Sequence, residues 1–424
     1  MRRVTFLLCL SPAFLLAQSP KDVRTVAKQG PTAIPTVAGY LNSANADTRI
    51  EAVKQLIALG GKDTIDPLIR ATHDADPEVQ FRATDGLVNF YLPGYVRQGL
   101  GSTVIRVGES VKAKFSDKND QVIDTYVVVR PEVITALGQL ARGGSAMDTR
   151  ANACRAIGIL RGRAALPDLI DALRTKNNQV MYEAIAAMEK IGDPSAGPRI
   201  TYLLRDFDDR VQATAIEASG VLRNMDALPI LRGIVANPRN IKSERSALAA
   251  IAMMPQPQDR DVFLRELGSK DEKLRVSAAE GLARIGNPAD EPALAKVWQD
   301  EDKMAPRLAA AFALTEAKAA EGKTDLTEES PLRYLINTLN SAAYHDVAYS
   351  YLVEAARRKP VLEALYTALG DATSDEKIYI ARVLMESGDK GSIPWLEKIS
   401  RDNQSDVSKE GLRALRSLRA RLGA

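Results

Sequence analysis

The chain has 424 residues, of which 45% are hydrophobic and only 5% aromatic, so its core must consist mainly of Ala, Leu, Ile and Val. This composition favours closely packed helices over a β-sandwich or β-barrel, which would need more aromatic and β-branched residues. The 57 basic and 54 acidic residues leave a formal charge of +3. That balance argues against a dedicated nucleic-acid-binding protein, which would carry a marked basic excess.

Residues 1–17 predict a secretory signal peptide. Arg2 and Arg3 precede an apolar run that ends at Ala17, and this run is shorter than the ~20 residues that a membrane-spanning helix needs. Cleavage after Ala17 would export the protein to the periplasm or the outside, with no stable membrane span. It would also leave Cys154 as the single cysteine, so no intramolecular disulfide could form.

Short proline-led helices recur along the rest of the chain. The step is 31 residues from Pro167 to Pro198 and again from Pro198 to Pro229. A period near 30 residues with degraded terminal copies is typical of an α-solenoid. The prolines that open these segments are Pro35, Pro67, Pro131, Pro167, Pro198, Pro229, Pro292, Pro331 and Pro394.

The segment 271–298 defines one repeat. Leu274, Ala278 and Leu282 lie on one face of a predicted helix that Asp271 caps. Gly286 and the residues after it end that helix, and Pro292 lies in the first turn of a second one. Because one such pair has no core of its own, the sequence predicts an all-α fold, a solenoid of about eleven helix pairs.

This repeat resembles the short HEAT-like repeats of phycobilisome-lyase-related proteins. The segments 177–204 and 271–298 carry the resemblance best, through a Val- or Arg-containing, Ala-rich helix followed by Gly and a proline-led helix. The resemblance covers most of 31–424 and implies the solenoid fold. For activity it implies only two alternatives, bilin-lyase chemistry and an oxidoreductase like deoxyhypusine hydroxylase.

Two departures divide the repeats. A non-repeat insertion is predicted at 93–130, between the second and third pairs, and a polar connection at 318–330. They separate N-terminal repeats (18–92), central repeats (131–317) and divergent C-terminal repeats (331–424). The insertion mixes aromatic and cationic residues that a repeat does not require, so it is either an interaction segment or a cap over a hydrophobic edge. Its candidate interaction residues are Tyr95, Arg97, Arg106, Lys112, Lys114 and Phe115.

Arginines recur near the start of the first helix of each pair. They form either a positive stripe for an acidic partner or a structural ladder in which each arginine bonds a carboxylate or carbonyl between repeats. The presence of nearby helix-start carboxylates favours the structural ladder. Its members are Arg49, Arg150, Arg245, Arg275 and Arg307.

No group of residues predicts a catalytic, cofactor-binding or metal site. The two histidines, His73 and His345, are about seven repeats apart, on the order of 60 Å at the usual helix spacing, so they cannot share a metal. Cys154 occupies a predicted core position, which favours a packed thiol over a reactive one. The main interpretation is therefore an exported, non-catalytic scaffold that binds a protein or peptide on its concave face, with the lyase or oxidoreductase as the alternative.

Overall fold

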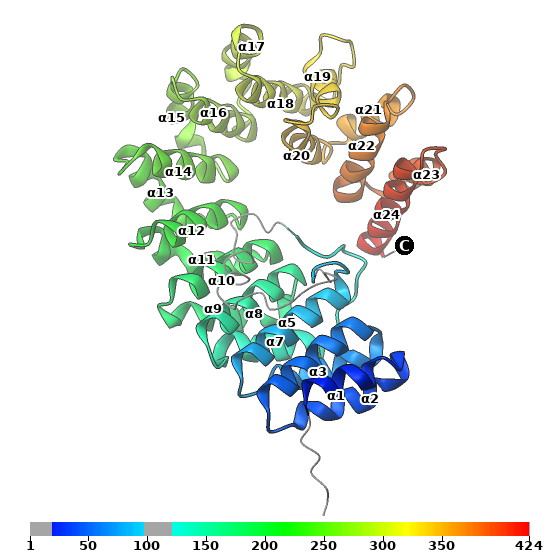
Figure 1. Cartoon of the computed structure of the whole chain (residues 1–424). Coiled ribbons are helices and arrows are strands. Elements are labelled where there is room, and N and C mark those ends of the chain that lie inside the picture. The colour runs from blue at the N-terminus through cyan, green and yellow to red at the C-terminus, as the bar shows by residue number, and fades with distance from the viewer. Residues whose placement is uncertain (1–18, 97–120, 424) are drawn as a thin grey trace, which may run out of the picture. The chain divides into compact units, whose positions relative to one another are not determined.

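The computed structural model describes residues 19–96 and 121–423, which form 23 α-helices and no strand (Figure 1). The helices follow one another as eleven pairs with one last helix, α24 (Ser405–Leu422). The predicted all-α solenoid is thus confirmed. The predicted leader and residues 97–120 of the insertion lie outside the described residues, so export stays a prediction.

Each pair joins a first helix to a second helix that is usually shorter. The first helices are α1 (Pro20–Ala27), α3 (Ala46–Leu59), α5 (Pro77–Tyr91), α8 (Met147–Ile159), α10 (Asn178–Ile191), α12 (Asp209–Val221), α14 (Ile241–Met253), α16 (Glu272–Ile285), α18 (Met304–Ala320), α20 (His345–Ala355) and α22 (Ser374–Ser387). The second helices are α2 (Ile34–Gly39), α4 (Ile65–Ala71), α7 (Pro131–Gly143), α9 (Leu166–Ala172), α11 (Gly197–Ile200), α13 (Leu228–Ala236), α15 (Arg260–Glu266), α17 (Glu291–Asp300), α19 (Pro331–Thr338), α21 (Lys359–Ala368) and α23 (Ile393–Ile399).

Local sequence sets the limits of these helices. At the start of α16, Asp271 Oδ1 accepts hydrogen bonds from the backbone N–H groups of Lys273 (3.0 Å) and Leu274 (3.2 Å), which are otherwise unsatisfied in the first turn. At its end, Gly286 takes the left-handed conformation with φ 68°. Asn45, Asp76 and Asp208 cap the starts of α3, α5 and α12 in the same way. The repeat in the sequence therefore produces a regular succession of helices.

Small residues allow the helices to pack closely. Ala278, Ala279 and Ala283 of α16 are buried. A Cβ atom built on Gly281 would lie 2.4 Å from the Phe263 ring of α15, so only glycine fits at this helix contact. Close helix packing of this kind explains how a chain with few aromatic residues still fills its core.

The contacts divide the chain into two compact units. Unit 1 comprises residues up to 122 together with 129–187, and unit 2 comprises 123–128 and 188–424. The division falls within α10. The predicted connection at 318–330 is shorter in the structure, because α18 continues to Ala320 and Ser330 caps α19.

The insertion lies within a helix pair. It follows α5, the first helix of the third pair, and precedes α7, the second helix of the same pair. The proline spacing places it between the second and third pairs, and this prediction is wrong. The spacing misleads because it counts only second helices, whereas α5 begins at its own proline, Pro77.

Candidate functional site

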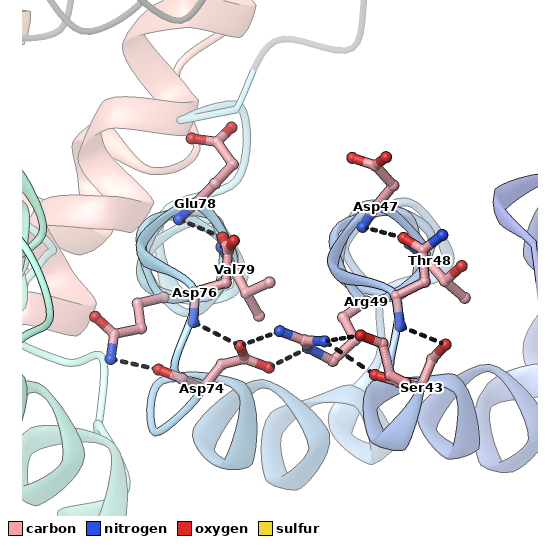
Figure 2. Close-up of polar contacts among 11 residues, drawn as sticks. Ser43, Asp47, Thr48, Arg49, Asp74, Asp76, Glu78 and Val79 are labelled. Carbon is pink, nitrogen blue, oxygen red and sulfur yellow. Dashed lines mark hydrogen bonds and ion pairs between the residues drawn. The ribbon is translucent and has the colours of Figure 1, made fainter.

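Arg49, the ladder arginine of the second helix pair, joins two helix starts in unit 1. Arg49 of α3 donates two hydrogen bonds to Asp74, Nε to Oδ2 at 2.7 Å and Nη2 to Oδ1 at 2.9 Å. Its Nη1 donates to the Ser43 carbonyl at 2.9 Å (Figure 2). Asp74 Oδ1 also accepts from the backbone N–H of Asp76, the residue that caps α5. The hydrogen bond that Arg49 donates to Asp74 raises the pKa of Arg49 above its ordinary value.

Two ladder arginines of unit 2 make the same kind of contact, which we call a rung. Arg245 bonds both carboxylate oxygens of Asp271, including Nε to Oδ1 at 3.0 Å, and this bond holds the pKa of Asp271 below its ordinary value. Arg275 bonds Glu301 at 2.7 and 3.1 Å. In each rung the carboxylate lies 25 or 26 residues further along the chain.

The other two ladder arginines have different contacts. Arg150 donates from Nε to the Ala141 carbonyl at 2.9 Å, so it bonds the end of the preceding helix. Arg307 lies over the rings of Trp298 and Tyr334, 4.8 and 5.3 Å from their centroids. All five arginines thus contact parts of their own or neighbouring repeats.

Of the six candidate interaction residues in the insertion, only Tyr95 is described. It is half-buried, and burial together with the nearby charge of Asp85 raises its pKa. The pair formed by Arg155 and Glu183 lies near it and is almost fully buried, with side chains 2% and 5% exposed. Arg97, Arg106, Lys112, Lys114 and Phe115 lie outside the described residues.

The histidines and the cysteine make ordinary structural contacts. His73 bonds the Gln139 side chain at 2.9 Å, and His345 bonds the Ser341 carbonyl at 2.9 Å. Cys154 is fully buried, and burial raises the pKa of its thiol. Within 19–96 and 121–423, no group of His, Cys, Asp and Glu is arranged to hold a metal ion, and no helix is long and apolar enough to cross a membrane.

A charged cluster at the C-terminal ends of the first helices of unit 2 differs from the rungs. Arg284 of α16 donates two hydrogen bonds to Glu354 of α20, at 2.8 and 2.7 Å, and a third to the Ala252 carbonyl of α14 at 2.9 Å. Tyr351 donates to Glu280 at 2.6 Å. One arginine therefore joins three first helices that are distant in sequence.

A second pair completes the group. Arg358 donates from Nε to Glu316 Oε2 at 2.7 Å, whereas Glu316 Oε1 is buried and has no hydrogen-bond partner among the described residues. The Phe312 ring stacks on Tyr351 at 4.8 Å. We call this group the central cluster; its members are Glu280, Arg284, Glu316, Tyr351, Glu354 and Arg358.

Two carboxyl groups of the central cluster have pKa values that are shifted in opposite directions. Burial raises the pKa of Glu316, against the opposing effect of Arg358. Burial would also raise the pKa of Glu354. The hydrogen bonds and positive charge of Arg284 act against burial, and the pKa of Glu354 is lowered. Two neighbouring carboxyl groups whose pKa values are shifted in opposite directions form an arrangement suited to proton transfer, and the arginines are suited to binding a carboxylate.

The sequence analysis missed the central cluster. Arg284 and Glu316 occur nine residues after the ladder arginines of their repeats. The residue at this position is apolar in some repeats, as in Ala58 and Ile159, but charged in another, as in Lys190. A charge at this position therefore does not by itself mark a site.

Comparisons with known proteins agree with the repeat pattern. Residues 134–220 match the family model described as HEAT repeats. The chain is 28% identical over 158 residues to phycocyanobilin lyase subunit alpha of Nostoc sp. (strain PCC 7120), a match that covers 34% of this chain and 57% of the relative. The predicted HEAT-like repeats are thus confirmed, and they are similar to those of the phycobilisome-lyase type.

Two solved structures are similar to this chain at low identity. The complex of CpcE and CpcF of phycocyanin lyase from Nostoc sp. PCC7120 has 19% identity and a TM-score of 0.37, over 64% of this chain and 92% of that chain. Importin beta has 12% identity and a TM-score of 0.37, over 92% of this HEAT-repeat chain and 57% of that chain.

These comparisons correct the main functional interpretation of the sequence. The interpretation was an exported, non-catalytic scaffold that binds a partner on its concave face. The curated relative is a lyase subunit, so the non-catalytic scaffold is wrong as the main interpretation and the lyase alternative is favoured, while export stays a prediction. The error arose because the repeat pattern was taken as informative for fold only.

Proposed function

We propose that this HEAT-repeat protein is a subunit of a bilin lyase that acts together with a second protein. The observation that supports the proposal is the 28% identity to phycocyanobilin lyase subunit alpha. The chain spans 57% of that relative's length. We therefore propose, as part of this function, that a bilin is the substrate and that a second subunit is the partner. The earlier alternative of an oxidoreductase has no comparable support.

The central cluster supplies chemistry that such a function needs. A bilin is an open-chain tetrapyrrole with propionate groups, and guanidinium groups bind carboxylates with two parallel hydrogen bonds. Bilin chemistry also involves proton transfer at the pyrrole rings and the side chains. Glu316, whose pKa is raised by burial, is the residue we assign to hold such a proton.

Titration of the purified protein with phycocyanobilin tests the proposal. Binding should change the visible absorbance spectrum of the pigment and saturate at one pigment per chain. Arg358→Ala removes the bond to Glu316 and should weaken binding. Arg245→Gln removes a rung and serves as the matched control, with unchanged affinity. A spectrum identical to that of the pigment with an unrelated helical-repeat protein would refute the proposed function.

A further inference from the structure

A groove in unit 2 lies between α13 and the segment that precedes α12. Its volume is about 420 Å³, which is comparable to the clefts of about 300 to 1,000 Å³ in which proteins bind ligands. One side consists of Pro229, Ile230, Gly233 and Ile234 of α13. Their spacing places them on one face of this helix. Phe207 lines the groove from the segment before α12, so much of its surface is apolar.

The groove lies where a rung is reversed. Gln212 is the fourth residue of α12 and lines the groove, at the helix position that Arg275 has in α16. Arg239, 27 residues further along the chain, donates from Nη2 to Gln212 Oε1 at 2.8 Å and to Asp209 Oδ1 at 2.6 Å. The arginine therefore stands on the side where a rung has its carboxylate, and it borders the groove.

Two residues leave the apolar surface of the groove uncovered. A Cβ atom built on Gly233 would have no other atom within 4 Å, so the packing of α13 does not require glycine, in contrast to Gly281 of α16. Glycine is also less favourable than alanine inside a helix. Phe207 is 98% exposed. The repeat fold thus keeps open a surface that it could have filled.

The charges at the groove favour a negatively charged group. Arg205 and Arg239 both border it, and Arg205 is exposed and forms no ion pair among the described residues. The carboxylate of Asp206 accepts a hydrogen bond from the backbone N–H of Asp208 at 2.9 Å, so it is engaged by its own loop. Ser243 brings the first turn of α14 to the groove, and this end of a helix is positive.

We propose that this groove binds an extended peptide segment of a partner protein in which an acidic residue stands beside an apolar one. The apolar side chain packs against Ile230 and Ile234, and the carboxylate bonds Arg205. Asn237, which also lines the groove, has an exposed amide that can donate to and accept from a peptide backbone. Because Phe207 stands almost fully exposed, a peptide can cover more of this apolar surface than a small molecule can. The site is independent of the proposed bilin binding.

Two variants of the full chain and a library of random heptapeptides displayed on phage test this site. Gly233→Phe fills the groove, and the open space around the residue allows the fold to be retained. Lys296→Phe makes the corresponding change at the exposed, equivalent position of α17 and is the matched control. Arg205→Gln removes the cation without an ion pair, and Arg174→Gln is its control at the equivalent position of an earlier repeat.

Selection on the wild-type protein should enrich peptides with Asp or Glu within two residues of Leu, Ile or Phe. An enriched peptide, synthesised and titrated, should bind Gly233→Phe about tenfold more weakly. It should bind Arg205→Gln about fivefold more weakly, the effect of one exposed ion pair, and both controls as well as the wild type. Replacing the acidic residue of the peptide by its amide should weaken binding to the wild type and leave binding to Arg205→Gln unchanged.

The proposal is wrong if no peptide is enriched, if the enriched peptides lack an acidic residue, or if Gly233→Phe binds them as tightly as the wild type. A wild-type dimer that Gly233→Phe dissociates in analytical ultracentrifugation would also overturn it, because the occupant would then be a second copy of this chain. The titration with phycocyanobilin is a separate measurement, so failure of this site and failure of the proposed function are distinguishable.

Discussion

The rungs and the central cluster combine the same groups, arginine and carboxylate, at opposite ends of the first helices. In a rung, one arginine and one carboxylate are paired near a helix start, as in Arg275 and Glu301, whose side chains are 15% and 12% exposed. In the central cluster, several charges share one site near the helix ends, and one carboxyl oxygen of Glu316 is left without a partner among the described residues. The rungs recur with the repeat, whereas the cluster joins residues of several repeats at one place.

This difference separates charges that are fully paired from charges that are not. A rung carboxylate such as Asp271 caps a helix and accepts from an arginine at the same time, so its hydrogen-bonding capacity is used within the fold. Burial raises the pKa of Glu316, and one of its oxygens has no partner among the described residues. Groups with a shifted pKa and an incomplete set of partners are candidates for function.

The largest expected effect comes from removing Arg284. Arg284→Leu leaves Glu354 and Glu280 without their cation, and both are mostly buried. Loss of one partner from such a network should lower the free energy of unfolding by about 3 kcal/mol. Urea unfolding followed by circular dichroism measures this change.

The control for Arg284→Leu is a double variant that also contains Glu354→Leu. Because the second change removes the unpaired charge, it should restore a large part of the lost stability. If the double variant were as unstable as the sum of the two single variants, the two side chains would be independent, and the central cluster would not be one unit.

A pH titration distinguishes the carboxyl groups of the two regions. The pKa of Glu316 is raised above 4.5, so its favourable contribution is complete below pH 4.5 and is lost as the pH rises through the raised pKa. The stability of the wild-type protein relative to Glu316→Gln should therefore fall as the pH rises from 4.5 toward neutrality. Unfolding measured in urea across this range is the test.

Asp271 provides the opposite case. Its pKa is lowered below 3.8, so its contribution is present above pH 3.8 and is lost as the pH falls through the lowered pKa. The wild-type protein should thus lose its advantage over Asp271→Asn in acid. If the stability of the wild-type protein relative to both variants changed in the same direction with pH, the distinction between the two regions would fail.

A rung variant should have a smaller effect than Arg284→Leu. Arg245→Gln removes a pair whose arginine side chain is 34% exposed, so water replaces much of the lost interaction. We expect a loss of about 1 kcal/mol or less in the free energy of unfolding. A loss as large as that of Arg284→Leu would show that the rungs contribute more to the fold than their exposure indicates.

The sequence predicted what the repeat determines. Caps such as Asp271, helix ends such as Gly286 and the apolar face of 271–298 are local signals, and the structure confirms the resulting solenoid of eleven pairs. The place of the insertion was predicted less well. The proline spacing follows only the second helices, so it gives no information about the first helix α5.

The candidate site could not be predicted in the same way. Arg284 and Glu354 are 70 residues apart in sequence, and the packing of α16 on α18 and of α18 on α20 brings them together. Burial, which raises the pKa of Glu316, also depends on neighbours that the sequence does not place.

The smallest expected effect has the opposite sign and concerns the helix ends. Arg223→Gly and Arg161→Gly each remove a left-handed arginine and should raise the free energy of unfolding by about 0.5 kcal/mol, because relief of the backbone strain exceeds the extra entropy of glycine in the unfolded chain. Thermal unfolding of the two variants beside the wild-type protein measures it. The two changes should agree in stability, because both arginines have a positive φ just after the end of a first helix. A loss of stability in Arg223→Gly alone would mean that the Arg223 side chain stabilises the folded protein and that the backbone strain is the smaller effect there.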